Sequence, residues 1–282
     1  MKKFWKATGI GAAYFIVFMV VQFLVSLAGI LILLGSLILE QGMGMFKNPE
    51  QFREIYMTSL LTNMTWLVLV SNLVSILGLW IFFATRHKNF LKEVGLQKTS
   101  ARNLTMSVIF GTGVCFFVDL LTNILPFPET VIEQFELQHG MLWFGDIGLT
   151  FLSVALIGPV SEEICFRGLC YRRLKEGMPK WAAGLISSVF FGLAHGDPVW
   201  FLVGFVAGVS LSWIFETTGS LLPAIIVHVT NNAISALTSY FPLPEGIHQV
   251  LMYSGLLIAA GSAYLLHSWT HRPVEKQGIQ AT

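Results

Sequence analysis

Charged side chains are scarce in this sequence. Of its 282 residues, 12% are charged and 54% are hydrophobic, whereas a soluble domain averages about 25% charged residues. The mean hydropathy of +0.69 agrees with that contrast. The formal net charge is only +1, so nothing in the balance of charge indicates nucleic acid as a partner. The composition predicts an integral membrane protein whose surroundings are a lipid bilayer.

Cysteine is almost absent as well. The three cysteines are Cys115, Cys165 and Cys170, and their spacing matches no metal-ligand pattern such as C-x-x-C. All three lie in or beside apolar segments, so we interpret them as small buried hydrophobic residues. The sequence therefore supports no disulfide framework.

The chain also lacks an internal boundary. No linker divides it and no internal repeat is convincing, so we expect residues 1–282 to form a single integral membrane domain. A spanning helix needs about 20 predominantly apolar residues. Eight segments are candidates: 9–39, 64–85, 104–125, 147–175, 180–197, 199–215, 221–241 and 247–268. The predicted fold class is all-α, a polytopic membrane protein with about eight transmembrane helices and an active site inside the bundle.

Lysine and arginine indicate the topology. The first apolar run is far longer than the roughly 7–15 apolar residues of a cleaved signal peptide, so we interpret it as an uncleaved helix. With eight spans, four basic segments fall on one side: Lys2 to Lys6, Arg86 to Arg102, Arg172 to Lys180, and the tail with Arg272 and Lys276. This asymmetry predicts cytoplasmic N- and C-termini. It fits a bacterial plasma membrane, with the endoplasmic reticulum as an alternative.

Two shorter patterns allow more than one interpretation. Segment 130–138 is expected to be a short interfacial helix or a lid, or else a solvated loop. Gly204 and Gly208 have the spacing that lets helices approach closely. Because this spacing serves packing within a bundle at least as often as dimerisation, no oligomer is inferred from it.

Most other polar residues near the spans have ordinary interpretations. Gln22, Asn72, Asp119 and Asn123 are expected to form interhelical hydrogen bonds. Histidines near the ends of spans or in loops, such as His139 and His248, are interpreted as ordinary residues.

Two adjacent carboxylates in an apolar segment are the exception. Glu162, Glu163 and Arg167 lie within one predicted span, where each charge costs about 2.5–3.5 kcal/mol on insertion scales. Glu163 and Arg167 are four residues apart and can pair on one helix face, while Glu162 points about 100° away. We therefore predict that Glu163 and Arg167 give structural support and that Glu162 is free to act.

Three helices bring polar groups to one depth. Glu162 and His195 lie at similar distances on either side of a predicted turn near 177–180. At a rise of about 1.5 Å per residue, Glu162 lies about 15 Å and His228 about 14 Å from the basic boundary. Asn232 follows His228 by four residues and shares its helix face. We therefore expect these four side chains to converge inside the membrane.

This set of groups suits hydrolysis of an amide bond. A carboxylate in a low-dielectric site is a competent general base for water, and the histidine beside it, His195, can orient that water or move a proton. His228 and Asn232 could donate hydrogen bonds to a developing oxyanion. Glu162, His195 and His228 could equally bind Zn²⁺, whose ligands are of these types.

At these residues the sequence resembles the CAAX protease and bacteriocin-processing family of intramembrane proteases. Its three motifs are similar to Glu162-Glu163-x-x-x-Arg167, Phe191-x-x-x-His195 and His228-x-x-x-Asn232. Each pattern alone is weak, but all three occur in order on separate predicted spans. The resemblance covers about residues 147–240, which we interpret as the catalytic motif-bearing core.

The resemblance implies a membrane endopeptidase related to the type II CAAX prenyl endopeptidase. By this likeness Glu162 and His195 activate water, while His228 and Asn232 stabilise the oxyanion. A glutamate-dependent mechanism without a cofactor is expected, with a zinc site at Glu162, His195 and His228 as the alternative. The expected substrate is a membrane protein or peptide, lipidated or not.

Two other functions compete with proteolysis. Family members also include bacteriocin self-immunity proteins and membrane scaffolds, so a non-catalytic role is the main alternative. A transporter or channel with a proton relay is the third hypothesis. It ranks last because the chain shows no inverted repeat and its polar groups converge on one place.

Overall fold

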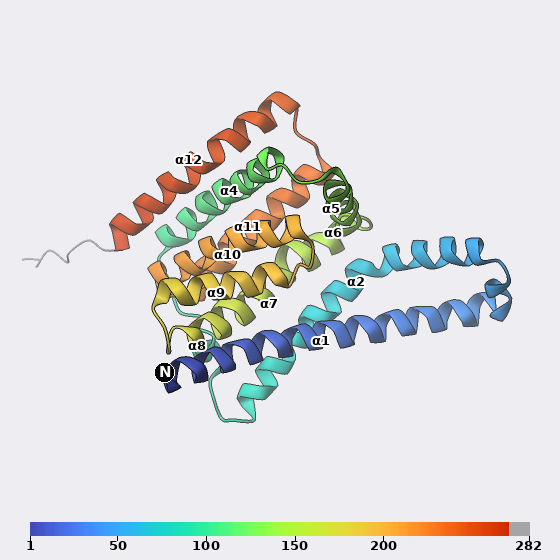
Figure 1. Cartoon of the computed structure of the whole chain (residues 1–282), viewed down its shortest axis with the longest axis horizontal. Coiled ribbons are helices and arrows are strands. Elements are labelled where there is room, and N and C mark those ends of the chain that lie inside the picture. Colours follow the sequence, from blue (N-terminus) through green and yellow to red (C-terminus); the bar gives the residue numbers. More distant parts are fainter. Residues whose placement is uncertain (271–282) are drawn as a thin grey trace, which may run out of the picture.

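The computed structural model describes residues 1–270, and these residues are helical almost throughout, without a β-strand (Figure 1). Arg272 and Lys276, and with them the predicted position of the C-terminus, lie outside these residues. The elements are α1 (Lys2–Gln41), η1 (Met43–Lys47), α2 (Pro49–Ala84), α3 (Phe90–Glu93), α4 (Ala101–Ile124), α5 (Glu129–Leu142), α6 (Ile147–Thr150), η2 (Phe151–Ile157), α7 (Gly158–Glu163), η3 (Ile164–Tyr171), α8 (Arg172–Leu174), α9 (Lys180–Leu193), α10 (Pro198–Thr218), α11 (Leu221–Tyr240) and α12 (Glu245–Thr270). The all-α fold class is confirmed.

The number of long spans is seven in residues 1–270, one fewer than predicted. The exception is the predicted span 180–197, because α9 has 14 residues. Its length is about 21 Å, which is less than the roughly 30 Å of a hydrocarbon core. The helix ends because Gly196 adopts a left-handed φ of 78°, and Asp197 then caps α10 by accepting hydrogen bonds from the backbone N–H groups of Val199 and Trp200.

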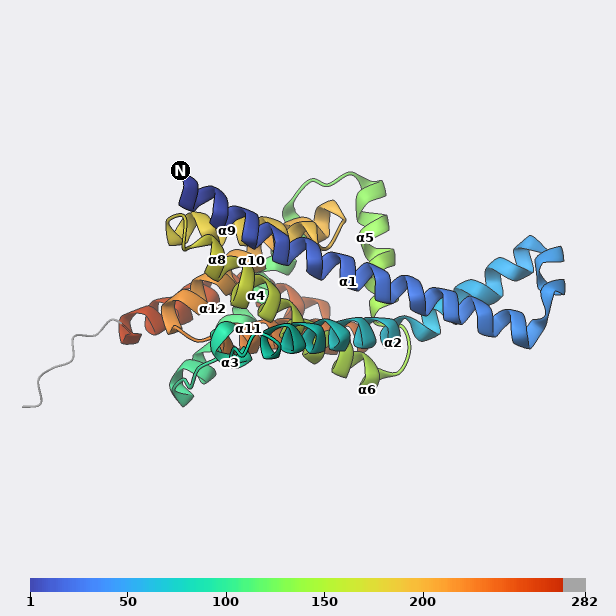
Figure 2. The same cartoon turned by 90° about the horizontal axis from the view of Figure 1, so that it is seen from below.

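The first two spans are longer than predicted. α1 and α2 contain 40 and 36 residues, and together they form a hairpin that extends beyond the other helices (Figures 1 and 2). The polar stretch before residue 64, predicted as a loop, belongs largely to α2. This helix begins early because the Asn48 side chain accepts the Gln51 N–H and Pro49 occupies the first turn.

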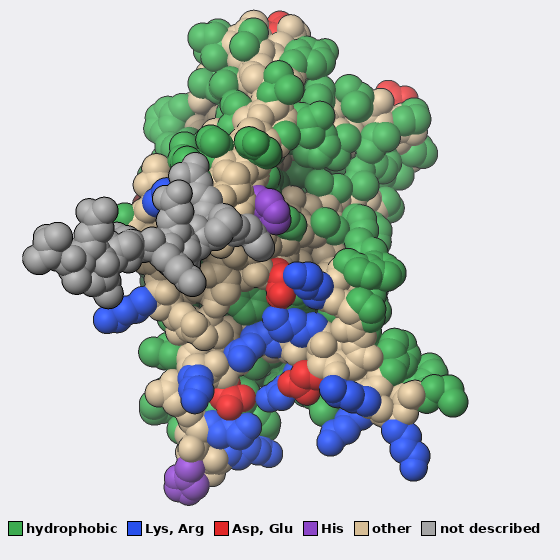
Figure 3. Space-filling view, turned by 90° about the vertical axis from the view of Figure 1, so that its left-hand side faces the viewer, with side chains coloured by type: hydrophobic (Ala, Val, Ile, Leu, Met, Phe, Trp, Pro, Cys, Tyr) green, Lys and Arg blue, Asp and Glu red, His purple; other side chains and the backbone are tan. Residues whose placement is uncertain are grey.

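The N-terminus and the end of α12 lie at the same end of the bundle (Figure 1). Lysine and arginine side chains gather on this face, here called the basic end (Figure 3). Ion pairs tie several of them to acidic side chains, including Arg173 with Glu93 at 3.4 Å and Lys175 with Glu216 at 2.8 Å. Which side of a membrane this end faces stays a prediction.

The segment from α6 to α8 is the buried span around which the other helices pack. α7, which carries both carboxylates, lies between two π-helical stretches, η2 and η3. The widened register is seen where the Gly158 N–H bonds to the carbonyl of Ser153, five residues back. Pro159, which has no N–H, follows directly and cannot restore the α-helical bond. Such stretches are frequent at functional sites.

Gly204 and Gly208 serve packing within the bundle. A Cβ atom on Gly208 would lie only 2.9 Å from the Cβ of Ser188 on α9. The small-residue spacing of α10 therefore lets α9 and α10 approach closely, as one of the two interpretations predicted.

Candidate active site

Glu163, Arg167 and His228 form a buried polar cluster that joins the span 147–174 to α11. The Arg167 Nη1 donates to Glu163 Oε1 at 2.7 Å, and His228 Nδ1 lies 2.9 Å from the same oxygen. Glu163 and Arg167 are both completely buried. The predicted pairing of Glu163 with Arg167 is therefore confirmed, whereas the contact with His228 was not foreseen.

The cluster also reaches α9. The centre of the Arg167 guanidinium lies 4.3 Å from the centroid of the Phe191 ring. The electron-rich face of an aromatic ring attracts a cation in this position. Within residues 1–270, Glu163 Oε2 and two of the Arg167 nitrogens have no hydrogen-bond partner. The two buried charges therefore have few polar contacts. Each of these contacts offsets a large part of the free-energy cost of burying the charges.

Glu162 points to a different place from Glu163. Its side chain is 26% exposed and lines a cavity of about 510 Å³ that His195, His228 and Asn232 also line. Glu162 Oε2 lies 3.6 Å from His228 Nε2, which is too long for a hydrogen bond. The carboxylate is thus available to a water molecule in the cavity, and the four predicted side chains do meet at one cavity.

His195 presents one ring nitrogen to this cavity. Its Nδ1 lies 2.8 Å from the carbonyl oxygen of Phe191, one turn earlier. Because a carbonyl oxygen can only accept, Nδ1 carries the hydrogen and donates this hydrogen bond. In the neutral ring, Nε2 then has a free lone pair. The imidazole also stacks on Trp200, with 6.1 Å between ring centroids. These contacts hold the ring in one orientation.

Asn232 is already engaged with the protein. Its Nδ2 donates to the carbonyl of Val154 at 3.0 Å, and its Oδ1 accepts from Asn231 Nδ2 at 3.2 Å. One N–H of Asn232 remains for a ligand. Asn231 also lines the cavity, and the sequence analysis missed it although it precedes a motif residue.

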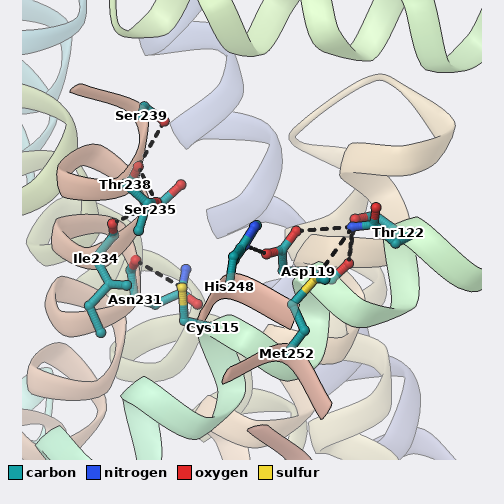
Figure 4. Close-up of polar contacts among 11 residues, drawn as sticks. Cys115, Asp119, Thr122, Asn231, Ile234, Ser235, Thr238, Ser239, His248 and Met252 are labelled. Carbon is teal, nitrogen blue, oxygen red and sulfur yellow. Dashed lines mark hydrogen bonds and ion pairs between the residues drawn. The ribbon is translucent and has the colours of Figure 1, made fainter. Parts of the chain in front are cut away.

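A second polar pair lines the same cavity between α4 and α12. Asp119 Oδ2 and His248 Nε2 are 2.6 Å apart, and the Thr122 hydroxyl donates to the backbone carbonyl of Asp119 at 2.8 Å (Figure 4). The Asn123 side chain donates to Asp119 Oδ1 at 3.3 Å. The expected interhelical role of Asp119 is confirmed, and His248, which was interpreted as an ordinary residue, is its partner and lines the cavity.

Segment 130–138 belongs to a helix, α5, that contributes side chains to the cavity wall. Phe135, His139 and Leu142 from this helix line the cavity. The ring centroids of Phe135 and Trp200 are 5.0 Å apart, and the Trp200 ring in turn stacks on the His195 ring. A chain of aromatic rings therefore connects α5 to the candidate catalytic histidine. The segment is a helix and not a solvated loop, and its action as a lid stays a prediction.

The stability of α5 is expected to fall at acidic pH. Trp143 Nε1–H donates to His139 Nε2 at 3.0 Å, which requires that nitrogen to be unprotonated. Burial lowers the pKa of His139, and the Asp119 carboxylate opposes this with a smaller effect. An unfolded chain takes up the proton near pH 6.5, so the local stability is complete above about that pH and declines below it.

Hydrogen exchange of the α5 amides measures this effect. After correction for intrinsic rates, protection should be lower at about pH 5.5 than at about pH 7.5. His139→Gln, whose amide oxygen can still accept the Trp143 N–H, should show little pH dependence. Equal pH dependence in the variant and the wild type would contradict the assignment to His139.

The side chains do not assemble into a closed metal site. Residues 1–270 contain no group of three or more His, Cys, Asp or Glu side chains arranged to hold a metal ion. His228 and His195 each use Nδ1 on a protein acceptor, which leaves Nε2 of each ring as the nitrogen that a metal ion could bind. The alternative zinc set of Glu162, His195 and His228 therefore stays a prediction.

Comparison with known proteins gives one family model and matches to bacterial proteins. Residues 145–234 match the family model for "Type II CAAX prenyl endopeptidase Rce1-like". "Putative membrane peptidase YdiL" of Bacillus subtilis is 28% identical over 112 residues, which are 40% of this chain and 46% of that protein. "UPF0177 protein YxdF" of Lactococcus lactis is 26% identical over 164 residues, 54% of this chain and 91% of that protein. No solved structure matches the chain.

The matched region and the candidate site coincide. Residues 145–234 contain Glu162, His195, His228 and Asn232, which line one cavity. The chain spans about half the length of the first of these relatives. The resemblance predicted from the three motifs is thus confirmed: residues 145–234 of this integral membrane protein match the model of the type II CAAX prenyl endopeptidase Rce1-like family.

Proposed function

We propose that the chain is an intramembrane endopeptidase that hydrolyses a peptide bond with water activated by Glu162. One observation carries the proposal. Of two adjacent carboxylates, Glu163 is buried and neutralised by Arg167, whereas Glu162 faces the cavity without a hydrogen bond from the protein. The name of the Bacillus subtilis relative as a membrane peptidase supports the same reaction class.

Each side chain has a role that its contacts support. Glu162 takes a proton from water as the hydroxide adds to the carbonyl carbon of the scissile bond. His195, held through Nδ1, accepts a hydrogen bond at Nε2 and orients that water. When the tetrahedral intermediate collapses, the carbon–nitrogen bond breaks and the proton held by Glu162 passes to the departing nitrogen. The remaining N–H of Asn232 donates to the oxyanion.

His228 is oriented by the buried carboxylate behind it. Its Nδ1–H donates to Glu163, so its Nε2 faces Glu162. With both ring nitrogens protonated, Nε2–H is a second donor to the oxyanion. This arrangement resembles the way a buried aspartate orients the histidine of a hydrolytic triad, although here the histidine stabilises charge and Glu162 is the base.

The cavity supports a peptide substrate from the membrane. Its walls combine the polar groups above with apolar and aromatic side chains such as Phe135, Trp200 and Val203. A segment of a membrane protein or peptide, with or without an attached lipid, fits such walls. The bacterial relatives and the basic end support a bacterial plasma membrane with a cytoplasmic N-terminus.

Hydrolysis by the purified protein in nanodiscs tests the proposal. A panel of membrane-anchored peptides is incubated with the protein, and products are identified by mass spectrometry. His195→Ala should lower the rate about 10²–10⁴-fold. His87→Asn, at an exposed turn residue that does not line the cavity, should not.

Two outcomes favour other functions. Activity lost on chelation and restored by zinc would support the metal-dependent version. A wild-type protein that cleaves no peptide, with a cellular phenotype unchanged by His195→Ala, would support the non-catalytic immunity or scaffold role.

A further inference from the structure

A second cavity lies outside the candidate active site, between α9 and α10 at the basic end. Its volume is about 410 Å³. Its wall contains Trp181, Gly184, Leu185, Val209, Ser212 and Trp213, and Tyr171, Lys180 and Glu216 also line it. None of them lines the cavity that holds Glu162.

The cavity exists because two helices diverge. Further from the basic end, α9 and α10 are in close contact, and a Cβ on Gly208 would overlap Ser188 at 2.9 Å. One turn nearer the basic end, a Cβ on Gly184 would meet Ser212 at an ordinary 3.5 Å. The contact at Gly208 closes the wedge toward the active site, and the absent side chain at Gly184 leaves it open toward the basic end.

The rim of the wedge carries excess positive charge. Glu216 is satisfied by Lys175 and by the Tyr171 hydroxyl, each at 2.8 Å. Lys180 lies 3.8 Å from Glu216 and its side chain is 70% exposed, so one cation is in excess. Lys180 is also the first residue of α9, whose N-cap Pro179 offers no side-chain acceptor to the N–H groups of the first turn.

The deeper wall contains an unpartnered polar group. Ser212 is only 4% exposed, and its hydroxyl has no hydrogen-bond partner within residues 1–270. Buried hydroxyls are normally paired. Because Ser212 lies in the wall of the wedge, one turn deeper than Glu216, a ligand that enters past Lys180 can supply that partner.

The outer edge of the wedge is apolar and exposed. Trp181, Leu185 and Val209 are 69%, 41% and 36% exposed. Tryptophan is enriched at the level of lipid headgroups, and Trp181 follows Lys180 directly. The wedge is therefore apolar where it meets the hydrocarbon region and cationic where it meets the headgroups.

We propose that this wedge binds a glycerophospholipid with an anionic headgroup. The phosphate contacts Lys180 and the first N–H groups of α9, which attract anions. A glycerol ester oxygen accepts the Ser212 hydroxyl, and an acyl chain lies along Leu185, Val209 and Trp213. A free phosphate could use the rim alone, but it would leave the apolar wall and Ser212 unoccupied.

Native mass spectrometry of the detergent-solubilised full chain tests the proposal with phosphatidylglycerol and phosphatidylcholine as probes. The wild type should retain phosphatidylglycerol in preference. Lys180→Gln should weaken this retention about five-fold, the value of one lysine near an anionic surface. Gly184→Leu should remove the bound lipid by filling the wedge. Lys98→Gln, an exposed lysine outside the wedge, is the matched control and should retain lipid as the wild type does.

Three results would overturn the proposal. These are equal retention of both lipids, equal losses in Lys180→Gln and Lys98→Gln, and full displacement of the lipid by inorganic phosphate. Thermal unfolding shows whether Gly184→Leu is folded; if it is not, the Lys180 and Lys98 variants decide the question. Because no step of this assay measures hydrolysis, its outcome is independent of the proposed protease activity.

Discussion

Glu162→Gln is expected to stop peptide hydrolysis while the protein stays folded. Glutamine has nearly the volume of glutamate, and the Glu162 side chain makes no hydrogen bond that the change would break, so stability should hardly change. An amide cannot take a proton from water at neutral pH. Loss of a general base lowers the rate about 10²–10⁴-fold, and this is the expected drop in kcat/KM in the nanodisc assay.

Two variants sharpen that experiment. Glu176→Gln removes an exposed carboxylate of the basic end, whose side chain is 53% exposed, and should keep full activity. Glu162→Asp keeps a carboxylate but withdraws it from the cavity, and should keep part of the activity. If Glu162→Gln hydrolysed peptide at the wild-type rate, the assignment of Glu162 as the general base would be wrong.

Arg167→Met is expected to cause the largest loss of stability. It leaves the Glu163 carboxylate in a completely buried place with only His228 as a partner. Removing one member of a buried ion pair costs about 3–5 kcal/mol. The free energy of unfolding, measured by denaturant titration in mixed micelles, should fall by about that amount.

Comparison variants separate lost charge from lost packing. Arg173→Met removes an arginine of the basic end whose side chain is 28% exposed and makes two ion pairs, and it should cost only about 0–1 kcal/mol. The double variant Arg167→Met with Glu163→Met removes both buried charges and should be more stable than Arg167→Met alone. If the double variant is the less stable of the two, the contact of Glu163 with His228 contributes more to stability than the unpaired carboxylate costs.

The sequence predicted most of the helices because apolar length is a local property. Predicted segments 199–215 and 221–241 correspond closely to α10 (Pro198–Thr218) and α11 (Leu221–Tyr240). Hydropathy indicates which residues lie in the hydrocarbon region of a membrane, but it does not indicate where a helix begins. The polar first turns of α2 were therefore not predicted. For α9, the predicted span 180–197 was too long, because it included the turn at Gly196 and Asp197 that follows the helix.

The candidate site was predictable only where helix geometry decides it. The separation of Glu162 from Glu163 follows from the helical repeat, and the common depth of Glu162, His195 and His228 follows from the rise per residue. The contact of His228 with Glu163 depends on how α11 packs against α7, which no pattern along the chain encodes.

His248 shows what signal was available but unused. Asp119 lies five residues before the end of α4, and His248 lies three residues after the start of α12. Both positions are at the end of the bundle opposite the basic end, so the depth comparison applied to Glu162 and His228 would have matched them. The aromatic link from α5 to His195 has no such signal, because it depends on the fold of residues 129–142 over the cavity.

Because π-helical stretches lie on both sides of α7, the directions of the two carboxylates depend on the number of residues in those stretches. Each residue advances an α-helix by about 100°, and a wider turn takes up an additional residue without ending the helix. The directions of Glu162 and Glu163 are therefore set by how many residues η2 contains as much as by their own side chains. A single insertion or deletion before Gly158 would rotate both acids together, moving Glu162 off its water-accessible wall and Glu163 away from His228 on α11. The pair of Glu163 with Arg167 would rotate as a unit, because both residues follow Gly158.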